Sequence, residues 1–193
     1  MKLYGSKTSP FVRRLRILLA EQNYEFSDFN IFGPEREALK AKNPTLKVPM
    51  FEDQVDGELV TIFDSGVTYR YLEKKLGLTP LTLEKQNLLS IVDACNDSMV
   101  NLLILKRSGI DTEQNALYFK IQSQRQNASF DYLEKIVEGE LFADWDYLAI
   151  CLLNLIQWAQ FRNLYDFSNY PKLLGFVEKH LNQPGVLETM PEE

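Results

Sequence analysis

The 193-residue chain has very few of the side chains that usually carry redox or metal chemistry: two cysteines, Cys95 and Cys151, and one histidine, His180. Both cysteines lie in apolar, helix-patterned stretches, which predicts buried, reduced thiols. No C-x-x-C pair is present to act as a dithiol redox centre. One histidine and two separated cysteines are too few ligands for a structural zinc site, so we expect no metal. His180 falls near the end of a helical pattern, where we expect it at the surface.

Long apolar runs and an excess of positive charge are also missing. The formal net charge is −6 and the pI is about 5.0, whereas non-specific nucleic-acid binding needs a basic surface. No uninterrupted apolar stretch reaches membrane-spanning length, and Lys2 and Lys7 flank too short an apolar run for a signal peptide. We therefore expect a cytoplasmic protein that binds neither nucleic acid nor membrane. An anionic ligand remains compatible with this charge, because a few local cations outweigh a distant negative field.

The first part of the chain alternates between strand and helix patterns in the order β-α-β-α-β-β-α, which is typical of a small α/β sandwich. Asp56-Gly57 predicts a hairpin between the last two strands. Asp64 or Ser65 is expected to cap the third helix. The patterns predict strands at 2–4, 25–31, 48–52 and 59–63, and helices at 11–21, 35–42 and 65–75.

The second part looks all-helical, since no convincing strand pattern follows Phe63. Gly77-Leu78-Thr79-Pro80 interrupts the periodicity and predicts a linker. The run from 144 to 164 is apolar on more than one face, as expected of a central buried helix. Thr112 is a plausible helix cap. Helices are predicted at 84–107, 112–137, 144–164 and 171–181. The predicted domains are therefore an α/β domain at 1–76, a linker at 77–83 and an all-α domain at 84–193.

The most informative segment follows the first strand and opens the first helix. Ser9 stands at the expected N-cap and Pro10 at the first helical position. The first N–H groups of a helix lack partners and the helix dipole makes that end partly positive, so an anion there is stabilised. A hydroxyl there can also donate a hydrogen bond to the anion. If the anion is a thiolate, this arrangement lowers the pKa of the thiol.

In the order and spacing of its motifs the chain resembles the cytosolic glutathione transferases, with closest likeness to bacterial, serine-type members. The motifs are Ser9-Pro10-Phe11 with Arg13-Arg14, then Asn43-Pro44 leading to Lys47-Val48-Pro49, then Asp64-Ser65 opening a helix, and Gln183-Pro184 with Glu188-Thr189-Met190-Pro191 near the C-terminus. The resemblance covers nearly the whole chain. It implies a thioredoxin-like N-terminal domain followed by an all-helical domain.

The resemblance also implies a catalytic residue. Ser9 would stabilise the thiolate of glutathione by a hydrogen bond, without forming a covalent bond and without acting as a base. Thr8 and Ser6 are neighbouring hydroxyls that could stand in for it. Arg13, Arg14 and Arg16 would add positive potential near the site, although part of this triplet also fits the polar face of the first helix.

The remaining site residues that the resemblance implies bind the tripeptide itself. Val48, ahead of a cis Pro49, would pair its backbone N–H and C=O with the cysteinyl backbone of glutathione. Ser65 would hold the γ-glutamyl carboxylate at a helix N-terminus, and Asp64 would face the γ-glutamyl ammonium. Lys47 could pair with the glycyl carboxylate. Helix capping alone also explains Asp64 and Ser65, and a solvated lysine explains Lys47.

One position departs from the family pattern. Where the family usually has Ser or Thr capping the central helix of the second domain, three residues before an Asp, this chain has Ala143 and Asp146. We expect Asp144 to cap instead.

The implied function is a glutathione transferase that activates glutathione, its co-substrate, for attack on a small hydrophobic electrophile. Detoxification is the role that follows, and a homodimer is expected through the helices at 65–75 and 84–107. The alternative is a binding or regulatory protein of the same fold without transferase activity. A dehalogenase or isomerase on the same scaffold is a third reading.

Overall fold

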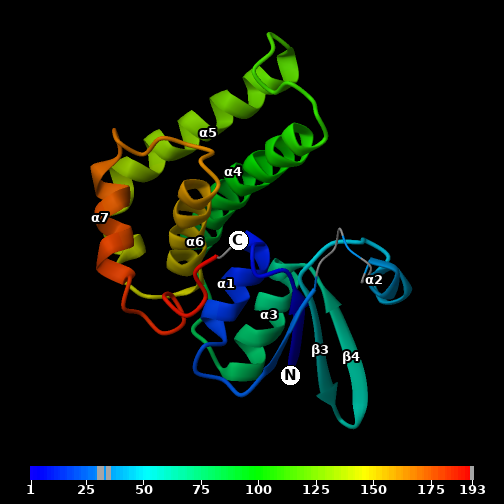
Figure 1. Cartoon of the computed structure of the whole chain (residues 1–193). Helices are drawn as coiled ribbons and strands as arrows, with labels where there is room; N and C mark the ends of the chain where they lie inside the picture. Colours follow the sequence, from blue (N-terminus) through cyan, green and yellow to red (C-terminus); the bar gives the residue numbers. More distant parts are fainter. Residues whose placement is uncertain (30–32, 34–35, 192–193) are drawn as a thin grey trace. The chain divides into compact units, whose positions relative to one another are not determined.

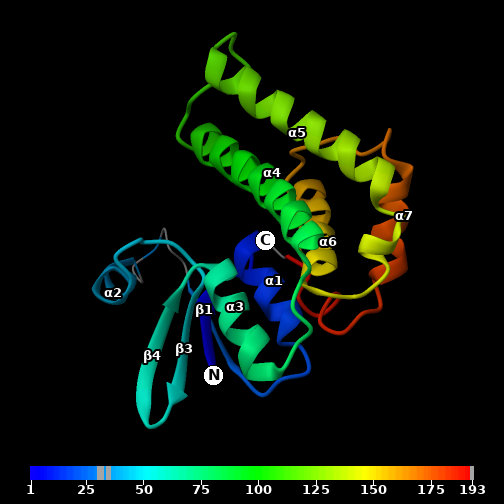
Figure 2. The ribbon, with the colours of Figure 1, turned by 180° about the vertical axis from the view of Figure 1, so that it is seen from behind.

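The computed structural model describes residues 1–29, 33 and 36–191, and its chain divides into two compact units (Figures 1 and 2). The first unit contains Met1–Pro80 together with Asn182–Glu193, and the second contains Leu81–Leu181. The thioredoxin-like α/β unit and the all-α unit expected from the sequence are therefore present. The C-terminal segment 182–193, however, belongs to the α/β unit, whereas the sequence analysis had placed it in the helical domain.

The first unit is built on a four-stranded mixed sheet with the order β2-β1-β3-β4. Strand β1 pairs parallel with β2 and antiparallel with β3, and β3 pairs antiparallel with β4. The β3–β4 hairpin turns at Asp56 and Gly57, which both have positive φ (52° and 87°), so the predicted turn is confirmed. The strands are β1 (Lys2–Gly5), β2 (Glu25–Asp28), β3 (Met50–Val55) and β4 (Glu58–Phe63). Part of the predicted strand at 25–31 lies outside the described residues.

Helices α1 (Pro10–Leu18) and α3 (Ser65–Leu76) pack side by side next to the sheet, and α2 (Arg36–Lys42) lies away from them (Figures 1 and 2). The apolar face of α1 is buried through Val12, Leu15 and Ile17. Asp64 is the N-cap of α3, and Gly77 ends that helix in the left-handed conformation.

The expectation that Arg13 and Arg14 lie on the polar face of α1 is wrong. Their guanidinium groups are buried. Arg13 donates hydrogen bonds to the C-terminal segment: from Nε to Thr189 Oγ1 (3.3 Å) and from Nη2 to the carbonyl of Val186 (3.1 Å). Burial lowers the pKa of Arg13 to about 10. These bonds account for the membership of segment 182–193 in the first unit, since they tie it to α1.

The second unit contains four helices and one 3-10 turn, and its core is α6, on which almost every side chain is buried. The elements are α4 (Leu83–Arg107), α5 (Leu117–Ile136), η1 (Glu140–Phe142), α6 (Tyr147–Phe161) and α7 (Pro171–His180). By length and composition alone α4 could cross a membrane, a property shared by core helices of soluble proteins. Asp93 and Asp97 interrupt its apolar run, so the expectation about uninterrupted runs is unaffected.

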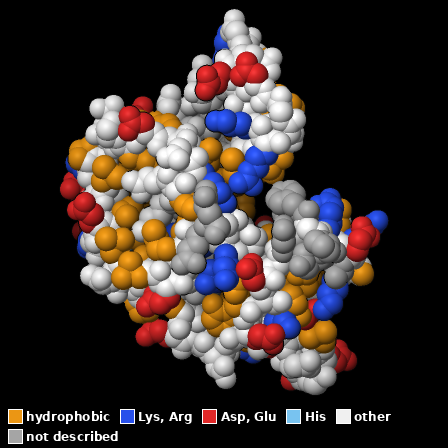
Figure 3. Space-filling model, in the orientation of Figure 1, with side chains coloured by type: hydrophobic (Ala, Val, Ile, Leu, Met, Phe, Trp, Pro, Cys, Tyr) orange, Lys and Arg blue, Asp and Glu red, His pale blue; other side chains and the backbone are white. Residues whose placement is uncertain are grey.

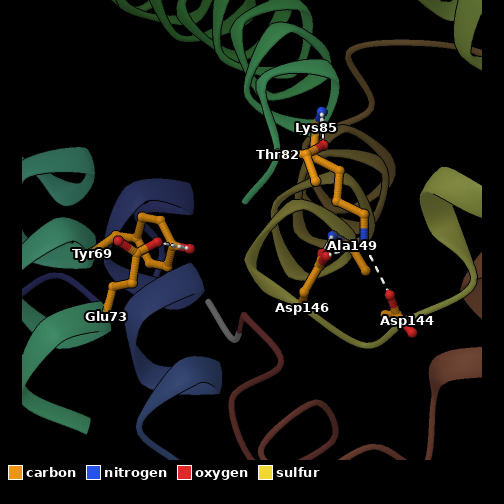
Figure 4. Close-up of polar contacts among 7 residues, drawn as sticks. All are labelled: Tyr69, Glu73, Thr82, Lys85, Asp144, Asp146 and Ala149. Carbon is orange, nitrogen blue, oxygen red and sulfur yellow. Dashed lines mark hydrogen bonds and ion pairs between the residues drawn. The ribbon is translucent and has the colours of Figure 1, made fainter. Parts of the chain in front are cut away.

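The N-terminus of α6 is held by Asp146, not by Asp144 as expected (Figure 4). Asp146 Oδ1 accepts a hydrogen bond from the N–H of Ala149 at 3.1 Å. Lys85 Nζ joins Asp146 Oδ2 (2.7 Å) to Asp144 Oδ2 (3.0 Å), so Asp144 contributes only through this lysine. An aspartate at the cap position therefore replaces the hydroxyl that the family usually places three residues earlier.

Two further expectations about the second unit are wrong. Helix α5 begins at Leu117 with Ala116 at the N-cap, so Thr112 caps nothing. His180 is buried, with its ring stacked on Trp145 (centroids 5.0 Å apart) and its Nδ1 2.8 Å from the carbonyl oxygen of Phe176. Burial lowers the pKa of His180. A buried imidazole flanked by aromatic rings is a packing element of this unit.

Both cysteines are free and buried, as predicted. Burial raises the pKa of the Cys95 thiol to about 12, so this thiol carries no thiolate at neutral pH. Any thiolate chemistry at neutral pH would therefore need a sulfur other than that of Cys95.

Gly185 packs the C-terminal segment against the end of α1 and the turn that follows it. Its φ is +78°, and a Cβ added there would lie 2.6 Å from Ala20 Cβ and 3.2 Å from Ile17 Cα. Gly185→Ala is expected to destabilise the protein by a left-handed penalty of about 1–2 kcal/mol plus an overpacking cost of about 1–3 kcal/mol. Urea denaturation measures the sum.

Gly109→Ala is the matched control, since Gly109 has nearly the same φ (+79°) but no atom within 4 Å of the added Cβ. It isolates the backbone penalty. Equal destabilisation by the two substitutions would contradict close packing of the C-terminal segment against α1.

Candidate functional site

Three loops of the first unit meet at one end of the sheet, and the strand register places them there. Tyr4 pairs with Met50, and Met50 pairs with Phe63, so these three residues form one row across β1, β3 and β4. Ser9 follows the end of β1, Val48 precedes the start of β3, and Asp64 follows the end of β4. The site residues expected from the sequence are therefore brought to one end of the sheet.

Ser9 is the N-cap of α1, as predicted, with extended backbone (φ −82°, ψ 126°). Its Oγ accepts a hydrogen bond from the N–H of Val12 at 3.4 Å, which is long for such a bond. The side chain is half-buried. Because a hydroxyl can accept from the helix and still donate, Ser9 can offer its proton to an anion in front of the helix.

Of the neighbouring hydroxyls, that of Ser6 makes its hydrogen bonds within the loop. Ser6 Oγ lies 3.0 Å from Thr8 Oγ1 and accepts a hydrogen bond from the N–H of Thr8 at 3.3 Å. The carbonyl of Ser6 accepts from the N–H of Ser9 at 3.0 Å. These contacts hold the turn that presents Ser9, and they leave Ser9 as the hydroxyl at the helix N-cap.

Gly5 is a contributor to this turn that the sequence analysis did not identify. A Cβ added at Gly5 would lie 2.3 Å from Val12 Cγ2, so only glycine lets the end of β1 pass so close to α1. The signal in the sequence is a glycine placed between a strand and a capping segment. Its effect is to seat the first turn of α1, and with it Ser9, directly beside the end of β1.

The second loop carries Val48 and Pro49, joined by a cis peptide bond as the resemblance implied. Pro49 is buried and Val48 is half-buried. Among the described residues, no hydrogen bond ends on the backbone N–H or C=O of Val48. Asn43 Nδ2 donates to the carbonyl of Lys47 at 2.8 Å and fixes the approach to this bond, while the Lys47 side chain is exposed.

The third loop holds Asp64 in a backbone conformation rare for any residue but glycine (φ 76°, ψ 143°). Asp64 Oδ1 accepts from the N–H groups of Gly66 (2.7 Å) and Val67 (3.2 Å), so it caps α3. Ser65 follows as the first residue of the helix and is buried, with 3% of its surface exposed. Such a conformation costs about 1–3 kcal/mol and is concentrated at binding sites, which favours a functional role here.

The spacing of the three loops suits an extended peptide of about three residues. Strands β1 and β4 are separated by β3, so they lie about 10 Å apart at the usual interstrand spacing. Three extended residues also span about 10 Å. Helix N-termini stand at both ends of this span, at Ser9 and at Asp64, and each favours an anionic group.

Two carboxylates of β3, Glu52 and Asp53, belong to structural networks. Tyr4 donates from its hydroxyl to Glu52 Oε2 at 2.5 Å, and Lys42 Nζ lies 3.0 Å from Glu52 Oε1. Burial alone would raise the pKa of Glu52, but the hydrogen bonds from Tyr4 and Lys42 outweigh it and hold that pKa below its usual value.

Asp53 has the same character, with hydrogen bonds from Tyr71 (2.6 Å) and Lys75 (2.8 Å). These bonds outweigh its burial and lower its pKa. Both carboxylates therefore stay ionised and bonded at neutral pH, so neither is set up as a general acid.

No group of three or more metal-ligating side chains occurs within the described part of the chain. Over the face drawn in Figure 3, acidic and basic side chains of the described residues are interspersed. The chemistry that this end of the sheet offers is thus recognition of an anionic peptide and stabilisation of an anion by Ser9.

Comparison with known proteins identifies relatives of this chain in sequence and in fold. Residues 3–80 match the family model described as "Glutathione S-transferase, N-terminal domain". The chain is 29% identical over 203 residues to the uncharacterized GST-like protein YibF of Escherichia coli (strain K12), covering 99% of this chain and 98% of that protein.

Two solved structures share the fold over essentially the whole chain. A glutathione transferase family member from Pseudomonas fluorescens Pf-5 with bound glutathione has a TM-score of 0.82 at 22% identity, covering 100% of this chain and 99% of that one. Maleylacetoacetate isomerase from Methylobacterium extorquens AM1, with bound malonate and GSH, has a TM-score of 0.72 at 19% identity, covering 99% and 96%.

The strained backbone of Asp64 gives a prediction about stability. Asp64→Gly relieves a conformation that costs about 1–3 kcal/mol and loses a cap at a cost of a few tenths of a kcal/mol. We expect it to raise the free energy of unfolding by about 1 kcal/mol in urea denaturation.

Asp64→Ala serves as the paired variant. It keeps the strained backbone and loses a cap worth about 1 kcal/mol, so it should be less stable than the unsubstituted protein. If Asp64→Gly proved no more stable than Asp64→Ala, the backbone at this position would not be strained.

Proposed function

We propose that this chain is a glutathione S-transferase, because residues 3–80 match the N-terminal domain of that family, and that it binds glutathione at the end of its sheet and activates the thiol for attack on a small hydrophobic electrophile. The observation that carries the proposal is the common row of Tyr4, Met50 and Phe63, which brings together three features. They are a helix-capping hydroxyl, the backbone of Val48, which has no hydrogen-bond partner among the residues described, and a second helix N-terminus. Each of the three matches one part of the tripeptide.

Ser9 is the proposed catalytic residue. A free thiol has a pKa near 8.5, so only a small part of glutathione is thiolate at neutral pH. A hydrogen bond from Ser9 Oγ and the positive end of α1 both stabilise the charged form, so both lower the pKa of the bound thiol. The thiolate then attacks the electrophilic carbon and the leaving group departs with its electron pair.

The remaining contacts orient the tripeptide. The N–H and C=O of Val48, ahead of Pro49, are proposed to pair with the cysteinyl backbone as an added strand. Ser65 and the N-terminus of α3 receive the γ-glutamyl carboxylate, and Asp64 faces the ammonium. Lys47, whose side chain is exposed at the same end, is proposed to meet the glycyl carboxylate.

Two further readings of the fold are separable from this one. A binding protein without transferase activity would need neither a hydroxyl at the N-cap of α1 nor a strained residue before α3, and this chain has both. An isomerase would use the same bound thiolate on a different substrate, and one structural relative is named as an isomerase. The two chemistries are distinguished by comparing turnover of an electrophilic aryl halide with cis-to-trans isomerisation of a cis-2-ene-1,4-dicarbonyl acid.

The proposal also covers assembly and cellular context. We propose a homodimer that uses α3 and α4, a cytoplasmic location and a role in detoxification. Helix α4 supports the dimer, because only 33% of its most apolar 18-residue window is buried within this chain. Leu102, Leu103 and Leu105 of this helix are half-buried and Ile104 is exposed, so these side chains are available for contact with a second copy.

Replacing Ser9 tests the mechanism. Loss of a hydrogen bond to a charged group costs about 1.5–3 kcal/mol, so Ser9→Ala should raise the pKa of bound glutathione by about 1–2 units. The measurement is the ultraviolet absorbance of the thiolate in the enzyme–glutathione complex as a function of pH. Little loss of stability is expected, because the capping bond that disappears is long.

Thr82→Ala is the control, since the Thr82 hydroxyl caps α4 with a similarly long bond (3.3 Å from the N–H of Lys85) but belongs to the second unit. It should leave the thiol pKa within a few tenths of a unit. A thiol pKa that is unchanged in Ser9→Ala would remove Ser9 from the mechanism and leave the helix N-terminus as the source of any activation.

A further inference from the structure

A cavity of about 330 Å³ lies in the first unit, between α1 with the turn that follows it and the C-terminal segment 184–189. Its lining combines Arg16, Ala20 and Tyr24 from the α1 side with Pro184, Glu188 and Thr189 from the C-terminal side. Arg16 lies in the last turn of α1, whereas Ser9 caps its first residue. The cavity is thus distinct from the proposed glutathione site.

The walls of this cavity are fixed by buried contacts. Arg13 donates to Thr189 Oγ1 and to the carbonyl of Val186, and Nη2 also lies 3.2 Å from the sulfur of Met190. Thr189 donates in turn to the carbonyl of Gly185 at 2.5 Å. A segment tied down at this many points gives the cavity a defined shape, as a ligand site requires.

Two opposite charges line the cavity, and neither has an ion-pair partner among the described residues. The guanidinium of Arg16 lies over the ring of Phe26, 4.5 Å from its centroid, and its Nε is buried without a hydrogen-bond partner there. Tyr24 lies beside it and is hydrogen-bonded to it: burial raises the pKa of that phenol, and the charge of Arg16 and this hydrogen bond partly offset the rise. Glu188 is exposed on the opposite wall.

The charge pattern selects the class of ligand. A simple anion would pair with Arg16 but be repelled by Glu188. A simple cation would pair with Glu188 but be repelled by Arg16. A molecule that carries both a carboxylate and an ammonium group satisfies both walls, and the planar guanidinium matches a carboxylate with two parallel hydrogen bonds. The volume is at the small end of ligand pockets, which limits the occupant to a small molecule.

We propose that this cavity binds a free α-amino acid, with its carboxylate on Arg16, its ammonium group on Glu188 and its side chain toward Ala20 and Pro184. The site does not depend on the proposed transferase function, because it shares no residue with the glutathione site. Binding closes the gap between α1 and the C-terminal segment and so stabilises the first unit.

The test is binding of four amino acids to the full chain: L-alanine, L-leucine, L-glutamine and L-phenylalanine. Binding is measured by calorimetry and by changes in amide chemical shifts. At least one is expected to bind at millimolar concentration and to shift the signals of residues 16–24 and 184–189. Its N-acetyl derivative, which lacks the ammonium group, and its amide, which lacks the carboxylate, should each bind about tenfold or more weakly.

Charge-neutral variants separate the two contacts. Arg16→Gln should abolish binding of the amino acid. Glu188→Gln should weaken its binding about tenfold, so that the free amino acid no longer binds more tightly than its N-acetyl derivative. Glu178→Gln, an exposed glutamate on α7 outside the cavity, should change nothing. A change of preference in Glu188→Gln cannot come from general destabilisation, because it compares two ligands on one variant.

Three outcomes would overturn the proposal. The first is no shift with any of the four amino acids at millimolar concentration. The second is binding that Glu188→Gln leaves unaltered, and the third is equal affinity for the amino acid and its N-acetyl derivative. Retained glutathione binding in Arg16→Gln would show at the same time that the two sites are independent.

Discussion

The pairing register of three strands is the constraint on which the rest of this protein depends. Because Tyr4, Met50 and Phe63 share one row, three loops that are distant in sequence end at the same edge. A shift of one residue in either pairing would turn every side chain of a strand to the other face. The buried Leu3, Met50 and Phe51 oppose such a shift, so core packing and site geometry are fixed by the same contacts.

The first unit concentrates its unusual features around that edge. Asp64 occupies a backbone region favoured only by glycine, and Gly5 lets β1 and α1 approach more closely than any Cβ would allow. Neither feature improves packing by itself. Each places a helix N-terminus next to the row, and both are understandable if an anionic ligand repays their cost. The C-terminal segment bonds to Arg13 in the first half of α1 and packs through Gly185 against Ile17 near its other end, so the helix that follows Ser9 is held along its length.

The sequence was sufficient for features that depend on local chemistry. Ser9 followed by Pro10 predicted the start of α1, and Asp56-Gly57 predicted the hairpin. The family resemblance selected Val48, Pro49, Asp64 and Ser65, which the strand register brings to one end of the sheet. It failed where tertiary contacts override a local pattern. Arg13 and His180 were expected near the surface because charged and polar residues usually lie there, yet partners far away in sequence bury both.

The predicted starts of two helices and the predicted domain of the C-terminal segment were wrong for a related reason. Asp144 and Asp146 are equally good caps by composition, and only the geometry of Ala149 and Lys85 selects Asp146. Thr112 precedes an apolar pattern like a cap, but the helix begins at Leu117. The C-terminal segment has no periodicity, so its packing on α1 through Gly185 could not be anticipated from the sequence.

The most direct measurement is a crystal structure of the protein soaked with glutathione. The account predicts the tripeptide extended across the row, with its sulfur within hydrogen-bond distance of Ser9 Oγ and its γ-glutamyl carboxylate at Ser65. The central claim would be contradicted if glutathione bound elsewhere, bound in the reverse direction, or did not bind at saturating concentration. Only the description of the fold would then stand.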